Sequence, residues 1–217
     1  MKRLVAYALI LTAAFALLTD VSAKGPMSVQ LCGAGGCTTV RDAALTHHMT
    51  WMGGSPIRTP APSVYYTVRF IAEDGGREAQ PRYYVPSAGA MRVLDELGRA
   101  RWEPVNRTAR DAYRDATAGL EPFARPELTA ARIGSQVVRG DASSYLRLYT
   151  VGNRFRGHTR RLKWLPIVLE SAQPSPWTDG ASRLAYAPSQ RLLRRDGGLY
   201  KLSRTLASRL MRATALH

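Results

Sequence analysis

Two stretches of this chain, 65–120 and 164–216, resemble each other, and this internal similarity limits the possible folds more than any other feature of the sequence. The tetrapeptide Tyr-Val-Pro-Ser at 84–87 returns as Tyr-Ala-Pro-Ser at 186–189. A repeated unit usually buries its apolar face against its neighbour. The sequence therefore predicts two tandem units that pack together.

Each stretch has the pattern of a strand meander that ends in a helix. Runs rich in β-branched and aromatic residues alternate with turn signals, which indicates antiparallel strands. The first unit has such runs at 65–72, 82–85, 91–94 and 101–103, and the second has them at 164–170, 184–186, 191–194 and 199–202. Asn106 and Ser203 precede apolar residues at helical spacing, so we expect each of them to cap a helix. Pro86 and Pro188 cannot donate to a strand ladder and predict a bulge or a sheet edge.

These patterns predict an α+β protein. Its antiparallel sheet is built from two tandem strand-meander-plus-helix repeats, with both helices on one face of a combined sheet. A disulfide-pinned N-terminal hairpin is expected at an edge of that sheet. We expect one mature domain, 24–217, after a signal peptide at 1–23. Within this domain we distinguish a hairpin and linker (24–64), the first repeat (65–120), a connector (121–163) and the second repeat (164–216).

The first 23 residues have the pattern of a secretory signal peptide. Lys2 and Arg3 precede an almost wholly apolar run, Leu4–Leu18, and small residues at 21–23 predict cleavage before Lys24. The apolar run is shorter than the roughly 20 residues that span a bilayer, and an uncleaved anchor is the alternative. We therefore expect a secreted or extracytoplasmic protein, in the periplasm or cell wall, with no transmembrane segment in the mature chain.

The only two cysteines, Cys32 and Cys37, flank a glycine-rich turn between two short strand patterns. In an exported protein such a pair is most simply a disulfide. Closing so small a loop is worth about 2 kcal/mol in the chain-entropy description, which is enough to pin a hairpin. A thiol or metal role is the alternative, although the four intervening residues do not match the two of thioredoxin-like sites.

The formal net charge is +15, from 31 basic and 16 acidic residues, and only four of the basic residues are lysines. Either the arginines serve a surface that meets an anionic polymer or membrane, or they reflect the coding bias of a GC-rich genome. The densest cluster lies at 154–163. Its basic residues are the predicted polyanion-binding residues: Arg154, Arg156, Arg160, Arg161 and Lys163. The alternative for this cluster is a solvated loop that protects a sheet edge.

The expected partners are anionic envelope polymers or lipid head groups. We expect arginines of the C-terminal helix to extend the same basic face. The cluster contains a single aromatic residue, Phe155, so it lacks the stacking platform of a single-strand nucleic-acid binder. Export also argues against nucleic acid. The leading hypothesis is an exported, non-catalytic binding or envelope-associated protein.

The first alternative is an exported hydrolase that acts on cell-envelope material. The sequence contains no G-x-S-x-G, H-E-x-x-H or calcium-loop motif. Its carboxylates, such as Asp95, Asp179 and Asp196, lie mostly in turns, where acidic residues are common. We therefore predict no catalytic residue and no cofactor.

The second alternative is copper binding through the segment 46–52. It contains His47, His48, Met49 and Met52, and His and Met suit copper in an oxidising compartment. Adjacent His side chains point in different directions on a strand or a helix. We therefore predict a partly buried segment and no metal site.

One tryptophan, Trp177, lies in the Pro-rich loop 171–180. Two environments are open to it. It is either an exposed aromatic contact for a ligand or a buried residue, and burial is the commoner position for such a side chain.

Overall fold

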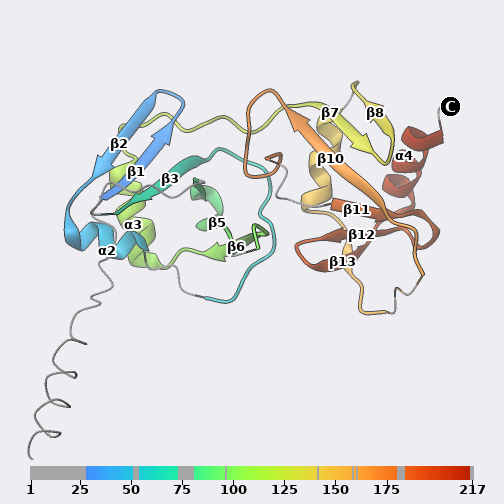
Figure 1. Cartoon of the computed structure of the whole chain (residues 1–217), viewed down its shortest axis with the longest axis horizontal. Coiled ribbons are helices and arrows are strands. Elements are labelled where there is room, and N and C mark those ends of the chain that lie inside the picture. Colours follow the sequence, from blue (N-terminus) through green and yellow to red (C-terminus); the bar gives the residue numbers. More distant parts are fainter. Residues whose placement is uncertain are drawn as a thin grey trace, which may run out of the picture.

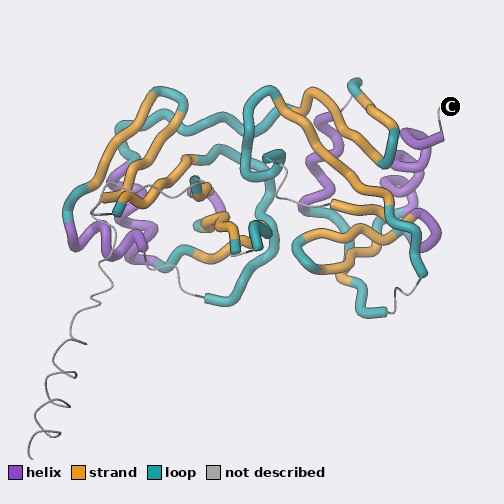
Figure 2. Tube along the Cα trace, viewed as in Figure 1, coloured by secondary structure: helices purple, strands orange, loops and turns teal. Residues whose placement is uncertain are grey.

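The computed structural model describes residues 28–50, 54–72, 81–95, 97–140, 142–157, 159, 161–179 and 184–215. In this part of the chain there are two antiparallel sheets, one in each half of the molecule (Figure 1). Figure 2 shows helices beside each sheet and long loops that connect the halves. The predicted α+β class is confirmed. The predicted signal peptide lies outside the described residues.

The first half contains a six-stranded sheet in the order β2-β1-β3-β4-β5-β6. Its strands are β1 (Ser28–Gly33), β2 (Gly36–Val40), β3 (Tyr66–Ile71), β4 (Arg82–Val85), β5 (Ala90–Leu94) and β6 (Ala100–Pro104). Its helices are α2 (Ala43–Thr50), the short 3-10 helix η1 (Pro86–Ala88) and α3 (Arg107–Ala116).

The second half contains a seven-stranded sheet in the order β8-β7-β10-β11-β12-β13-β9. Its strands are β7 (Leu128–Ile133), β8 (Gln136–Val138), β9 (Asn153–Arg154), β10 (Leu165–Ser171), β11 (Leu184–Ala187), β12 (Leu192–Arg195) and β13 (Gly198–Lys201). Its helices are the 3-10 helix η2 (Ala142–Tyr149), the short 3-10 helix η3 (Pro188–Gln190) and α4 (Arg204–Ala215).

The two halves run through the same order of elements. Each begins with a hairpin and a helix, continues with strands that are interrupted once by a 3-10 helix, and ends with a helix. Four strands follow the first helix in the first half, and five follow it in the second half, where β9 is the additional one. The sheets also share their strand order, except that β9 is added at one edge of the second sheet. The tetrapeptides that resemble each other in sequence lie at the same place in both halves, at the ends of β4 and β11.

The predicted combined sheet is replaced by one sheet for each half, so α3 and α4 pack on different sheets. The reason lies in the connector. Residues 131–138 form the end of β7, a turn and β8, because Gly134 adopts a positive φ of 61° that reverses the chain. This hairpin adds two strands to the second half, which thereby has a complete sheet of its own. The helix η2 packs beside this sheet.

The prediction of a bulge or edge at Pro86 and Pro188 is wrong. Each proline begins a 3-10 helix, where the first position needs no amide donor. Gly89 and Arg191 end these helices, and both have a left-handed φ of 54°. The two halves therefore share this turn down to its backbone angles.

The predicted helix caps are observed. The Asn106 side chain accepts a hydrogen bond from the amide of Ala109 at 2.8 Å, and the Ser203 hydroxyl accepts one from the amide of Leu206 at 3.3 Å. These bonds satisfy amides that have no partner within the helix. They determine where α3 and α4 begin.

The predicted N-terminal hairpin is confirmed. Cys32 and Cys37 lie opposite each other in the β1–β2 register and form a disulfide. The hairpin is not isolated, because β1 also pairs with β3. The disulfide therefore pins the outer strand of the first sheet.

Two apolar cores stabilise the halves. In the first, side chains from one face of the sheet pack against α2 and α3, as shown by the burial of Tyr66, Val68 and Phe70 at alternate positions of β3. The second core lies between the second sheet, η2 and α4, and it extends to Tyr83 and Trp102 on the other face of the first sheet. One core thus includes residues of both halves. No helix among the described residues is long and apolar enough to cross a membrane.

Trp177 is the side chain that joins the halves. It lies in the 172–179 loop between β10 and β11, and only 1% of it is exposed. Its ring lies 5.6 Å from that of Trp102 and 6.1 Å from that of Tyr65, and its Nε1 donates to the carbonyl of Pro60 at 3.1 Å. The loop of the second half is therefore inserted against the first sheet.

An ion pair lies beside this tryptophan. Arg92 on β5 donates to both carboxylate oxygens of Asp179, at 2.6 and 2.7 Å. The Arg92 side chain is 1% exposed and that of Asp179 is 14% exposed. A charge so deeply buried requires its partner. The contacts of Trp177 and Asp179 together determine how the 172–179 loop lies against the first sheet.

The contact between the 172–179 loop and the first half depends on pH through Tyr65. Its hydroxyl donates to the carbonyl of Pro174 at 3.0 Å, and burial, aided by Tyr83, raises its pKa from 10 to about 12. Because the folded pKa is raised, the stabilisation is complete below pH 10 and is lost as the pH rises toward 12. We expect the free energy of unfolding to fall more steeply over this range in the wild type than in Tyr65→Phe, measured by urea unfolding. Equal slopes would show that the pKa of Tyr65 is the same in the folded and the unfolded protein.

Candidate functional site

Charge is distributed unevenly between the halves. Residues 121–217 contain 17 basic and six acidic residues, a net charge of +11, whereas residues 1–120 contain 14 and ten, a net charge of +4. A positive field of this size attracts anions and is screened by salt. In the second half this charge meets a cavity.

Each of the three acidic residues of the segment 142–215 is held by a partner of its own. Glu170 pairs with Arg132 at 2.7 Å, and Asp179 is held by Arg92. Asp196 accepts a hydrogen bond from the hydroxyl of Thr59 at 2.5 Å.

A cavity of about 420 Å³ lies between the end of η2 and the start of α4. We call it the basic pocket. It is lined by Arg147, Val151, Gly152, Asn153, Lys201, Leu202, Ser203, Thr205, Leu206 and Arg209. Three of these residues are basic and none is acidic. The pocket therefore combines positive charge with an apolar wall.

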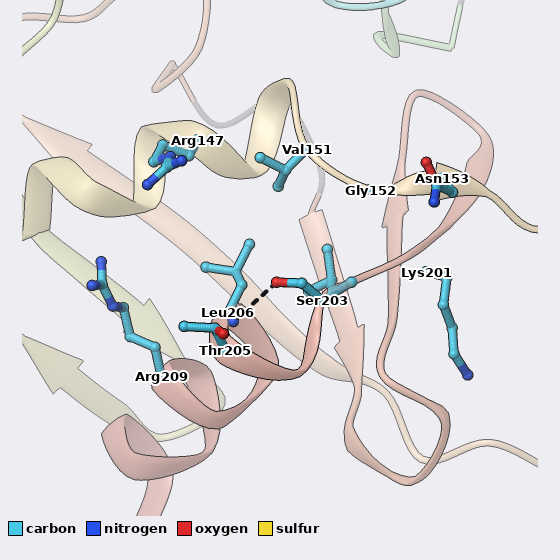
Figure 3. A pocket seen from close by; sticks show the side chains of 10 residues that line it. Arg147, Val151, Gly152, Asn153, Lys201, Ser203, Thr205, Leu206 and Arg209 are labelled. Atoms are coloured by element: carbon cyan, nitrogen blue, oxygen red, sulfur yellow. Dashed lines mark hydrogen bonds between the residues drawn. The ribbon is translucent and has the colours of Figure 1, made fainter.

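Figure 3 shows how the basic side chains lie. Arg147 and Arg209 are on the same side of the pocket, although they come from η2 and α4. Lys201 is at the opposite end, and its ammonium group bonds to the carbonyl of Gln190. An anion in the pocket would therefore meet the two guanidinium groups, while Lys201 contributes through its charge.

A buried arginine holds the η2 wall of the pocket in place. Arg195 is 2% exposed and donates to the carbonyl of Leu148 at the end of η2, and also to that of Val151 at 3.4 Å. Its guanidinium lies 4.1 Å from the centre of the Tyr200 ring. Helix-end carbonyls favour a cation at this position. Arg195 thus anchors η2 to β12 and β13.

Gly152 brings the chain close to β13. It has a φ of 98°, and a Cβ at this position would lie 2.9 Å from the Cβ of Tyr200 and 3.2 Å from the carbonyl oxygen of Lys201. Only glycine can adopt this positive φ and also leave room for the neighbouring strand without strain. After this turn β9 pairs with β13, so that Asn153 lies opposite Lys201.

The apolar wall is formed by side chains that also contact the core. Leu202 is 2% exposed, and Val151 and Leu206 are partly buried and pack against the second core. These side chains keep their positions because the core holds them. The wall is therefore preformed.

The predicted polyanion-binding segment starts beside the basic pocket but does not line it. Arg154 is in β9, one residue after Asn153, and it is exposed. Arg156, Arg161 and Lys163 are also exposed, and Arg160 lies outside the described residues. We call 154–163 the basic segment. The alternative that it protects a sheet edge fits Arg154, because β9 is the edge strand of the second sheet.

Sequence reasoning missed the pocket as a site. It placed Arg209 on the C-terminal helix, but it gave no role to Arg147 or Lys201. Arg147, Lys201 and Arg209 come from three elements, η2, β13 and α4, which are spread over more than fifty positions of the sequence. No local motif connects them, so only the fold reveals the cluster.

The residues considered for copper do not converge. All three described residues belong to α2, where Met49 is fully buried whereas His47 and His48 are exposed; Met52 lies outside the described residues. The ring centres of His47 and His48 are 6.1 Å apart. Within the described part of the chain, no group of three or more His, Cys, Asp or Glu residues is positioned to hold a metal ion.

The carboxylates considered for hydrolysis serve turns and contacts between the halves. Asp95 accepts hydrogen bonds from the amides of Arg99 and Leu97, and these bonds, the first above all, lower its pKa below the usual value. Asp179 and Asp196 hold partners in the first half. Their separate roles explain these three residues without a catalytic function.

Comparisons of the chain with protein-family models, with curated protein sequences and with solved structures found no match. The site therefore has to be interpreted from its own chemistry.

Proposed function

We propose that this chain is an exported, non-catalytic binding protein whose second half contacts anionic material of the cell envelope, either polymers or lipid head groups. The observation that carries the proposal is the basic pocket together with the basic segment. Two guanidinium groups share one side of a cavity whose described lining residues include no acidic one, and four further exposed basic residues follow from its edge. Such surfaces attract anionic groups with a strength that falls as salt rises.

Export is part of this proposal. The sequence of the first 23 residues motivates it, and a disulfide between Cys32 and Cys37 fits an oxidising compartment. We also propose that the two halves arose as an internal repeat and that 24–217 folds as one domain. Their shared element order and the buried Arg92–Asp179 pair support these two statements.

The test compares two variants with the same change in net charge. One replaces Arg154, Arg156, Arg161 and Lys163 by Gln. The control replaces four exposed arginines of the first half by Gln: Arg41, Arg99, Arg101 and Arg107. Binding to polyphosphate, and to phosphatidylglycerol or phosphatidylcholine vesicles, is measured at low and at physiological salt.

We expect the basic-segment variant to lose at least a hundredfold in affinity for anionic vesicles at low salt, since a basic residue near such a surface contributes about 1 kcal/mol. The control should lose much less. Preference for polyphosphate or for vesicles distinguishes polymers from head groups as the source of the anion. Equal losses in both variants would mean that only net charge matters, and no binding at low salt would refute the proposed function.

A further inference from the structure

The basic pocket has a feature that a simple polyanion contact does not need. A phosphate-bearing polymer is polar along its length and gains nothing from an apolar wall. Yet Leu202, Val151 and Leu206 line the same cavity as Arg147 and Arg209. Sites for small ligands typically combine a mostly apolar lining with a few polar groups that set the orientation.

We propose that the basic pocket binds an anionic amphiphile, a molecule with one phosphate-like or carboxylate group attached to a short apolar chain. This inference rests on the proposed function and names the chemical class of ligand for its pocket. The anionic group lies between Arg147 and Arg209, and the apolar chain lies along Val151, Leu202 and Leu206. Guanidinium groups suit this role because they bind phosphate and carboxylate in a bidentate geometry.

Three properties of the pocket support this division of roles. Figure 3 shows both guanidinium groups on one side, so that the charge is concentrated at one place. The wall residues are held by the second core, so that an apolar chain meets a surface that is already formed. The volume of about 420 Å³ suits a small ligand.

The test uses three small probes on the mature protein, each below its micelle concentration: octyl phosphate, inorganic phosphate and octyl glucoside. Binding is measured by isothermal titration calorimetry. We expect octyl phosphate to bind at least tenfold more tightly than either of the other probes, because both of its parts contribute. Burial of apolar surface also predicts a negative heat-capacity change for octyl phosphate.

Variants assign the two parts of the site. Arg147→Ala, on an exposed position, should weaken octyl phosphate binding at least fivefold, and Leu206→Ser should reduce it to the level of inorganic phosphate. Because Leu206 also contacts the core, Val151→Ser serves as a second variant of the wall. The control Arg132→Ala removes the same charge from β7, outside the pocket and the basic segment, and should leave the affinity unchanged.

The outcomes separate this inference from the proposed function. If octyl phosphate binds no more tightly than inorganic phosphate while polyphosphate still binds the basic segment, the pocket is not an amphiphile site and the proposed function stands. An equal loss in Arg132→Ala and Arg147→Ala would also overturn the inference. Absence of polyphosphate and vesicle binding at low salt would instead refute the proposed function.

Discussion

Replacing Asp179 by Ala should destabilise the protein by about 3–5 kcal/mol, which is the usual cost of leaving a buried charge without its partner. Arg92 is 1% exposed, and both of its terminal nitrogens bond to this carboxylate. The loss is measured as the free energy of unfolding of residues 24–217 in urea. The reason for the large effect is that water cannot reach the orphaned guanidinium.

Two controls make this prediction specific. Glu170→Ala breaks the exposed pair with Arg132 and should cost at most about 1 kcal/mol. Replacing both members, as Arg92→Met with Asp179→Leu, should restore most of the stability because no charge then remains buried. A loss for Asp179→Ala as small as that for Glu170→Ala would show that the pair is not buried in solution.

Trp177→Ala should also destabilise the protein by about 3–5 kcal/mol, the range for removing a buried tryptophan. The indole fills the space between Tyr65 and Trp102 of the first half, and its Nε1 bonds to Pro60. Since this side chain joins the halves, we expect a single unfolding transition for the wild type and a broader or divided transition for Trp177→Ala. Calorimetry detects both effects.

The matched control for this change is Trp164→Ala. Trp164 is only partly buried, and Arg194 lies over its ring at 4.2 Å. Its removal should cost roughly 1 kcal/mol, as for most substitutions outside the core. If both tryptophans cost the same and the transition stays sharp, Trp177 does not join the halves.

Local features of the fold could be predicted from the sequence because they depend on neighbouring residues. The alternation in β3, the caps at Asn106 and Ser203, and the cysteines that flank the hairpin turn each need only a few adjacent positions. The prediction failed at Pro86, where a missing amide donor suits a sheet edge and the start of a 3-10 helix equally well.

The arrangement of the halves could not be predicted, because it depends on contacts between distant residues. The similarity between 65–120 and 164–216 did not reveal that the connector supplies a hairpin to the second sheet. In the sequence, Arg92 and Asp179 are ordinary polar residues 87 positions apart. Only the packing of the 172–179 loop on the first sheet makes them a buried pair.

The same limit applies to the candidate site. The basic segment was found in the sequence because its charges are contiguous. The basic pocket was not, because η2, β13 and α4 each supply one basic residue to it. Arg195 and Gly152, which hold the pocket wall in place, likewise have no local signal for that role.

The most direct test of the account is a titration of the mature protein with tripolyphosphate, followed through the backbone amide signals by NMR at low salt. We predict that the shifts concentrate at Gly152, Ser203 and Arg209 of the basic pocket and along the basic segment, 154–163, and that they disappear as salt is raised. Shifts of equal size across the first half, or no shifts at all, would contradict the central claim that the second half of this protein is built to bind anions.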